Sequence, residues 1–356
     1  MGEILGIGTT HAPQLMFAGD AKNMPGKLPA YMNRALERGA VPANWADSKN
    51  WPEPLRDEWG EDEAASFGIR HRIQLLNAFH KIRDALDDFK PDLVLIYGDD
   101  QYENFNDDLV PPFAVYAYDE FEMQPLMRQK DGNPWGEPVD KIFKYKGHRE
   151  AGVYLTNALM ASGFDVAYAY RPLHAHGLAH AHTNTLVFLD DDRRGWNYPV
   201  LPIHINCHGD RFVRNRATGG VINDHLPADP SSPTPERCFE LGRVVARTFF
   251  DSPWRVAIIG SASWSHGGLT AKNQWVYPDV EADRELLQYM LNDDYLHFRD
   301  LNVEDLENSG QQEIRDWCAL LGGMYELGHT TKLLEWAESW TYNSTKVMAL
   351  FPANEP

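Results

Sequence analysis

Cysteine is scarce in this sequence of 356 residues. Only Cys207, Cys238 and Cys318 occur, far apart in the chain and without a Cys-x-x-Cys pair. Disulfide frameworks and thiolate zinc sites need several closely patterned cysteines, so both are disfavoured. This usage fits a reducing compartment, and we expect a cytoplasmic protein.

The sequence also lacks long apolar runs and an excess of positive charge. No stretch approaches the roughly 18 consecutive apolar residues that indicate a membrane span, and the first residues show no signal-peptide order. Acidic residues number 52 against 33 basic ones, for a net charge of -19. Nucleic acids, anionic membranes and polyanionic substrates are bound through cationic groups. We therefore expect a soluble protein with no nucleic-acid or membrane partner.

Helical segments alternate with short apolar runs along most of the chain. A helical pattern at 68–89 precedes the apolar run 93–97, and one at 149–162 precedes the run 164–170. A third helical pattern, at 235–250, precedes the run 255–260. This alternation predicts an α/β fold with a central, largely parallel or mixed sheet flanked by helices.

A chain of this length is compatible with one elaborated α/β domain, and we predict a single catalytic domain over 1–356. Residues 18–66 are rich in Pro, Asn, Trp and acidic groups without periodicity, which predicts a long loop excursion. Its aromatic residues Trp45, Trp51 and Trp59 favour a subunit contact over a lid. We predict that 281–356 is mainly helical, with helices near 281–292, 313–325 and 331–341.

Three apolar runs end in polar groups that can bind a metal or move a proton. The first leads to His11, the second enters Gly98-Asp-Asp-Gln-Tyr-Glu-Asn-Phe105, and the third leads through a small-residue turn to His266. Sites in open α/β sheets lie outside the carboxyl ends of the strands, and imidazole titrates near neutral pH. We therefore predict that His266 is a proton carrier.

Mononuclear iron sites for oxygen chemistry use a few ligands on one face, commonly two His and one carboxylate. His11 is one leading ligand, and Glu281 in Tyr277-Pro-Asp-Val-Glu-Ala-Asp283 is the other. Each of these residues also has a purely structural interpretation. Glu281 is also what the first turn of a helix favours, His11 can be a buried hydrogen-bonded residue, and His266 can be a turn residue.

Four histidines, His174, His176, His180 and His182, follow the run at 164–170. Such clusters suggest metal binding, but Gly177 interrupts the regular alternation that would aim them together. We interpret His174 and His176 as part of a solvated loop. His180 is the better candidate for the site, and His182 is a possible ligand or outer-shell residue.

These elements together resemble the class III extradiol ring-cleavage dioxygenases, the superfamily of the protocatechuate 4,5-dioxygenase beta subunit, over about residues 3–325. Gly8-Thr-Thr-His-Ala-Pro13 resembles the turn that holds the first iron-binding His, and Gly177-Leu-Ala-His180 the element with a substrate-pocket His. Gly260-Ser-Ala-Ser-Trp-Ser-His266 resembles the turn with the catalytic acid/base, and Glu281-Ala-Asp283 the carboxylate ligand. Asn308-Ser-Gly-Gln-Gln-Glu-Ile-Arg-Asp-Trp317 is similar to a segment of the 3-O-methylgallate type.

One departure from the best-known members of that family matters for the metal site. Where they have Asn-Asp-His, this chain has Asp99, Asp100 and Gln101, with Phe105 at the matching spacing. Gln is neutral like His, so Gln101 keeps the formal charge of the iron site, whereas an added carboxylate from Asp100 would oppose an anionic catecholate. We rank Gln101 above Asp100 as the third ligand, and Asp99 is a possible ligand or outer-shell residue.

The resemblance implies a non-haem Fe(II) enzyme that opens a catechol- or gallate-type ring with O2. In this hypothesis His11, Gln101 and Glu281 hold the iron, His266 moves a proton, and His180 donates a hydrogen bond. The partners would be a small aromatic diol or triol and O2, in a homodimer or higher homo-oligomer. Two alternatives stay open: a zinc-type hydrolase or lyase on the same scaffold, and a non-catalytic binding protein of the same fold.

Overall fold

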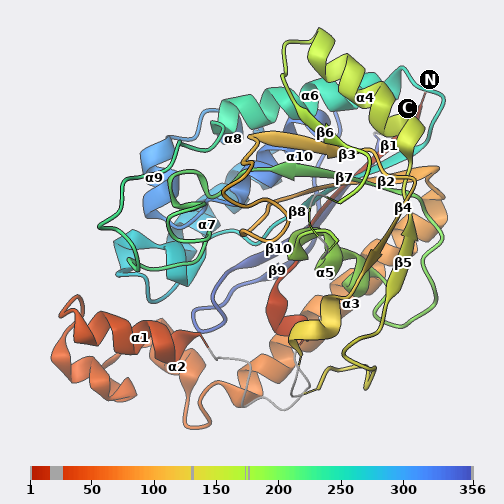
Figure 1. The fold of residues 1–356 in the computed structure, drawn as a ribbon. Coiled ribbons are helices and arrows are strands. Elements are labelled where there is room, and N and C mark those ends of the chain that lie inside the picture. Colours follow the sequence, from red (N-terminus) through yellow and green to blue (C-terminus); the bar gives the residue numbers. More distant parts are fainter. Residues whose placement is uncertain (1, 17–26, 130–131, 173, 175–176, 354–356) are drawn as a thin grey trace.

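Eight strands form one mixed sheet in the computed structural model of this protein (Figure 1). The structure describes residues 2–16, 27–129, 132–172, 174 and 177–353. In spatial order the strands are β6 (Ala167–Ala169), β3 (Phe113–Tyr116), β7 (Val200–Ile205), β2 (Leu93–Gly98), β8 (Val256–Ser261), β1 (Ile4–Thr9), β10 (Lys346–Phe351) and β9 (Lys332–Ala337). A separate two-stranded sheet pairs β4 (Glu120–Met123) with β5 (Phe143–Lys146).

The four central strands, β7, β2, β8 and β1, are parallel to one another. Each is buried along its whole length, which accounts for their nearly continuous apolar sequences. Their register aligns the carboxyl ends: Thr9 lies opposite Ser261, Tyr97 opposite Gly260, and Gly98 opposite His204. The segments that follow these strands therefore meet at one edge of the sheet.

Helices cover both faces of the sheet (Figure 1). The helices of the described residues are α1 (Leu28–Glu37), α2 (Glu53–Trp59), α3 (Ala65–Phe89), α4 (Arg149–Ala161), α5 (His180–Leu189), α6 (Pro235–Phe250), α7 (Val280–Leu291), α8 (Leu296–Arg299), α9 (Val303–Asn308) and α10 (Ile314–Leu327), of which α1 and α2 lie away from the sheet (Figure 1). Alternate residues of β2 separate the two cores: Leu93 and Leu95 pack with α4, α6 and α10, whereas Val94 and Ile96 pack with α3 and α5. The predicted α/β class with a mixed sheet is confirmed.

Two sequence predictions about secondary structure are wrong. The described part of 18–66 contains α1 and α2, and Trp51 and Trp59 are buried in a third apolar cluster with Tyr342 rather than displayed to a partner. The segment predicted as a helix at 331–341 contains strand β9, and the C-terminal region also contains β10. β9 pairs antiparallel with β10, so non-local pairing overrides a spacing that looks helical. Among the described helices, none has the length and apolar character that a membrane crossing requires.

Helices α6 and α10 approach each other closely under the central strands. A Cβ atom added to Gly242 would overlap the carbonyl oxygen of Ala319, and one added to Gly322 would overlap that of Phe239. These glycines let the two backbones pack directly against each other. The contact fixes the position of α10 relative to the sheet.

We predict that Gly242→Ala lowers the free energy of unfolding by about 1–3 kcal/mol, because the added methyl group forces the two helices apart. Urea denaturation followed by circular dichroism measures the change. Lys81→Ala, on the exposed side of α3, is the control and should change stability by less than about 0.5 kcal/mol. Equal stability of Gly242→Ala and the parent protein would contradict the close packing of α6 on α10.

Candidate metal centre

Polar side chains gather where the four central strands end. His11 follows β1, Asp99 follows β2, His208 follows β7, and His266 follows β8. Glu313 joins them from the residue immediately before α10. The first three and Glu313 are at most 2% exposed, and the His266 side chain is 12% exposed. Sites of this type occupy the carboxyl edge of open α/β sheets.

Three of these residues form a group that can hold a metal ion: His11, Asp99 and Glu313. The Nε2 atom of His11 lies 3.6 Å from Oδ1 of Asp99 and 3.5 Å from Oε2 of Glu313. Its Nδ1 lies 2.9 Å from the carbonyl oxygen of Ser261, which accepts its proton. This assigns the lone pair to Nε2, the arrangement typical of metal-binding histidines. Burial lowers the pKa of His11 to about 4, which keeps the ring neutral near pH 7.

The two carboxylates each present one oxygen without a hydrogen bond. Oδ1 of Asp99 and Oε2 of Glu313 are buried and have no hydrogen-bond partner among the described residues. These are the same atoms that face His11 Nε2. Buried anionic oxygens are costly unless they are paired or coordinate a metal. Two carboxylate oxygens and an imidazole nitrogen suit a divalent iron, manganese or zinc ion, so the residues fit the implied metal.

The electrostatics of this carboxylate pair differ between its members. Burial alone would raise the pKa of Asp99, but the hydrogen bond from His208 and the nearby His11 hold it far below its usual range. Burial and the charge of Asp99 raise the pKa of Glu313 well above its usual range. Like charges this close in a buried site repel each other and push their pKa values apart. A cation between them removes that conflict.

His208 was not identified in the sequence analysis. Its Nε2 lies 2.9 Å from Oδ2 of Asp99 and donates to it, since a carboxylate only accepts. The same nitrogen is 3.7 Å from Oε1 of Glu313. This hydrogen bond occupies Oδ2 of Asp99, and Oδ1 faces His11. The rule that sites lie beyond the carboxyl ends of the strands would have identified His208, because it comes three residues after Ile205, the last residue of β7.

His266 lies beside Glu313. Its Nδ1 donates to the carbonyl oxygen of Trp264 at 2.9 Å, so the unprotonated Nε2 faces Oε2 of Glu313 at 3.3 Å. Burial and the neighbouring His11 lower the pKa of His266 to about 3. The ring is neutral near pH 7, with the lone pair of Nε2 directed toward Glu313.

Gln101 and Asp100 occupy different environments after β2. Gln101 contacts the group through its amide nitrogen, which donates to Oε1 of Glu313 at 3.1 Å. Asp100 turns away and accepts the backbone N–H groups of Glu103 and Asn104, each at 2.8 Å. Burial raises the pKa of Asp100 to about 7. Asp100 thus closes the turn, and Gln101 holds one oxygen of Glu313.

His180 begins α5 and stands against the ring of His11. The two ring centroids are 5.0 Å apart in an edge-on contact. Nδ1 of His180 donates to Oε2 of Glu103 at 2.7 Å, and the other oxygen of Glu103 pairs with Arg128. Burial opposes a charged ring, but the carboxylate of Glu103 raises the pKa of His180. Glu103 therefore holds His180 next to the group and favours its protonated form, in which Nε2 is also a hydrogen-bond donor.

His182 and His174 do not belong to the buried group of His11, Asp99 and Glu313. His182 is buried in α5, and its Nε2 donates to the carbonyl oxygen of Ile203 at 3.1 Å. His174 is half-buried and lies 3.5 Å from Asp108. His176 lies outside the described residues.

Glu281, which the sequence analysis predicted as the carboxylate ligand, lies outside the buried group that contains His11. It is exposed in the first turn of α7 and contributes to the electrostatics of Lys272 and Tyr277. An acidic residue is stabilised there by the helix dipole, which is the structural interpretation of this residue. The second carboxylate is instead Glu313, in the segment Asn308–Trp317 that the sequence analysis compared with the 3-O-methylgallate type.

Comparisons with curated proteins point to dioxygenases. Three relatives carry the name 2,3-dihydroxyphenylpropionate/2,3-dihydroxicinnamic acid 1,2-dioxygenase. The protein of Photorhabdus laumondii is 27% identical over 203 residues, 57% of this chain and 52% of the relative. The protein of Comamonas testosteroni is 26% identical over 195 residues, which is 55% of this chain and 49% of that relative. The protein of Rhodococcus jostii is 29% identical over 189 residues, which is 53% of this chain and 48% of that relative.

The chain spans about half the length of the curated relatives it matches. No protein-family model matches it. Each of the three relatives is named as a dioxygenase of an aromatic diol, which supports the dioxygenase part of the resemblance. The 3-O-methylgallate subtype stays a prediction.

We predict that Glu313→Gln lowers the affinity for Fe(II) by more than about 100-fold, because losing a ligand costs more than the 10–100-fold typical of outer-shell residues. Metal content after anaerobic loading and gel filtration measures the change. Glu281→Gln, also at the start of a helix, should bind the metal like the parent protein. The opposite pattern would restore Glu281 as the ligand.

We also predict that His208→Leu weakens Fe(II) binding by about 10–100-fold, since Asp99 loses the donor that orients it. The same loading assay, run across a series of iron concentrations, gives the affinity. His225→Leu replaces an exposed histidine and serves as the control. Unchanged affinity in His208→Leu would show that Asp99 needs no orienting partner.

Proposed function

We propose that this protein binds a ferrous ion at His11, Asp99 and Glu313 and opens the ring of an aromatic diol with O2. One observation supports the proposal above the others. Two buried carboxylate oxygens without hydrogen bonds face the free nitrogen of His11, and the free nitrogen of His266 lies 3.3 Å from one of them. A set of metal-binding atoms and a proton acceptor therefore share one site.

The metal, when bound, supplies open coordination positions that bring the diol and O2 together and polarise the diol oxygens. His11 provides a nitrogen donor, and Asp99 and Glu313 each provide an oxygen. His208 and Gln101 hold the second oxygens of these carboxylates, at 2.9 Å and 3.1 Å respectively. The outer partners thus fix which oxygen each carboxylate offers.

His266 acts as the proton acceptor in this proposal. Its Nδ1 proton is held by the carbonyl oxygen of Trp264, so Nε2 is free to take a proton from a diol hydroxyl as the substrate binds. The protonated ring can later return that proton. General acid–base catalysis of this kind contributes about 10²–10⁴-fold to rates.

The two carboxylates make this proton acceptor more important than it would be in a site with neutral ligands. Ionised Asp99 and Glu313 together balance the charge of a divalent ion, so a diol that kept both negative charges would be repelled. Removal of one proton by His266 leaves a monoanion. The protonated ring of His180, whose Nδ1 donates to Glu103, then donates from Nε2 toward the bound substrate and stabilises its negative charge.

The relatives support an aromatic diol as the substrate class, and the resemblance to the 3-O-methylgallate type extends the proposal to trihydroxybenzoates and their methyl ethers. One His and two carboxylates also suit zinc, so a zinc-dependent hydrolase or lyase is the second candidate. Oxygen uptake separates the two, because a zinc enzyme of that kind consumes none.

We expect the protein loaded anaerobically with Fe(II) to consume O2 with a catechol, gallate or 3-O-methylgallate panel, and the zinc-loaded protein to consume none. An oxygen electrode measures uptake, and absorbance follows loss of the aromatic ring. Activity of the zinc form on esters or amides, without oxygen uptake by the iron form, would favour the second candidate.

His266→Ala should keep its iron but lose ring opening by about 10²–10⁴-fold, because it removes the proton acceptor and no ligand. Iron content and oxygen uptake are measured on the same preparation. His174→Ala, a histidine outside the group, serves as the matched control. Normal turnover in His266→Ala would overturn the role of this residue.

A further inference from the structure

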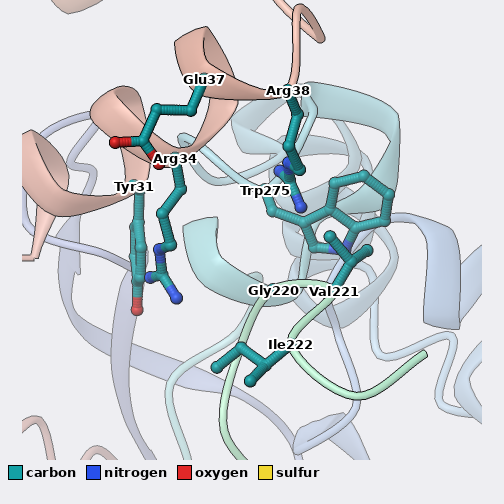
Figure 2. Close-up of a pocket in the computed structure, with 8 residues that line it drawn as sticks. All are labelled: Tyr31, Arg34, Glu37, Arg38, Gly220, Val221, Ile222 and Trp275. Atoms are coloured by element: carbon teal, nitrogen blue, oxygen red, sulfur yellow. The ribbon is translucent and has the colours of Figure 1, made fainter. Parts of the chain in front are cut away.

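A hollow separate from the buried metal group opens between α1, residues 220–222 and Trp275 (Figure 2). Its volume is about 270 Å³. Ligand pockets typically measure about 300–1,000 Å³, so this one matches a ligand of a single ring. The surface that lines it is mainly apolar, with Tyr31, Trp275 and Ile222 among its residues.

Two arginines line the hollow without a carboxylate partner. Neither Arg34 nor Arg38 forms an ion pair within the part of the chain that the structure describes, although Arg83, Arg193, Arg194 and Arg315 are all paired. The two arginines stand together at this hollow in a chain in which 52 acidic residues outnumber 33 basic ones. Their donors are available to an anion that enters the hollow.

Both guanidinium groups are held in place by aromatic rings. The Arg34 guanidinium lies 5.0 Å from the centroid of Tyr31, and that of Arg38 lies 5.2 Å from that of Trp275. Nε of Arg34 also donates to the carbonyl oxygen of Ala30, which leaves its terminal nitrogens for a ligand. A fork held in this way loses less conformational entropy when it binds a carboxylate.

The hollow shares a wall with the segment that follows His266. The backbone N–H of Gly220 donates to the carbonyl oxygen of Gly268 at 2.6 Å, and the Tyr31 hydroxyl lies against Gly268. Trp275 donates its backbone N–H to Thr270. The walls of the hollow are therefore held by backbone hydrogen bonds and are not formed by surface side chains alone.

We propose that this hollow binds a monocyclic aromatic carboxylate as a second ligand site. The ring lies against Tyr31, Trp275 and Ile222, and the carboxylate is bound by Arg34 with Arg38 beside it. Glu37 also lines the hollow, and its negative charge favours a monoanion over a dianion. This site goes beyond the proposed ring-opening reaction and does not depend on it.

The test is a ¹⁹F NMR titration of 4-fluorobenzoate with the full chain. We expect saturable binding that Arg34→Gln weakens at least about tenfold, since a hydrogen bond to a charged group is worth about 1.5–3 kcal/mol. The affinity of Arg34→Lys should lie between those of the parent protein and Arg34→Gln, because lysine keeps the charge without the planar guanidinium group. Arg70→Gln, an exposed arginine on α3, should bind like the parent protein.

Two comparisons separate this site from the metal centre. Glu313→Gln should bind 4-fluorobenzoate as tightly as the parent protein, whether or not the proposed reaction occurs. The neutral analogue 4-fluorobenzamide should bind at least about tenfold more weakly than the acid. Binding that survives in Arg34→Gln, is lost in Glu313→Gln, or is equal for acid and amide would overturn the proposal, and so would the absence of saturable binding.

Discussion

Two carboxylates buried side by side, Asp99 and Glu313, are the constraint on which the rest of this site depends. Burying one unpaired charge is costly, and burying two like charges together is costlier still. The surrounding donors bind only two of the four oxygens, since His208 donates to one oxygen of Asp99 and Gln101 to one oxygen of Glu313. The remaining two oxygens converge near the free nitrogen of His11. A divalent cation can bind these two oxygens and the nitrogen of His11 together.

The sheet explains why these residues meet. Its four central parallel strands are buried on both faces, so polar side chains gather only where the strands end. Their aligned register brings His11, Asp99, His208 and His266 to one edge. Glu313 arrives by another route, because α10 is fixed by its glycine-mediated contact with α6. Packing far from the site thus sets the position of a ligand.

Sequence reasoning located the part of the site that depends on local order. His11 and His266 follow apolar strands directly, and the strand-end rule identifies both. The rule also pointed to Asp99 and Gln101, but it could not say which of the residues after Gly98 turns inward. His208 was missed because the rule was applied only to the runs that lead to His11, to Gly98 and to His266.

The rest depended on contacts between distant segments. Glu281 and Glu313 both stand at helix starts, and only the packing of α10 against the sheet distinguishes the buried acid from the exposed one. The run Lys332–Ala337 has apolar residues at helical spacing, yet its pairing with β10 makes it a strand. Trp51 and Trp59 looked like interface residues because the helices that bury them lacked a clear periodicity.

The most direct test of the central claim is the location of the metal itself. A crystal structure of the protein loaded anaerobically with Fe(II), with anomalous scattering recorded at the iron edge, identifies the bound atom. We predict one iron at about 2.0–2.2 Å from Nε2 of His11 and from a carboxylate oxygen of each of Asp99 and Glu313, the usual range for such ligands. An iron bound elsewhere, or a loaded crystal with these three side chains unligated, would contradict the account.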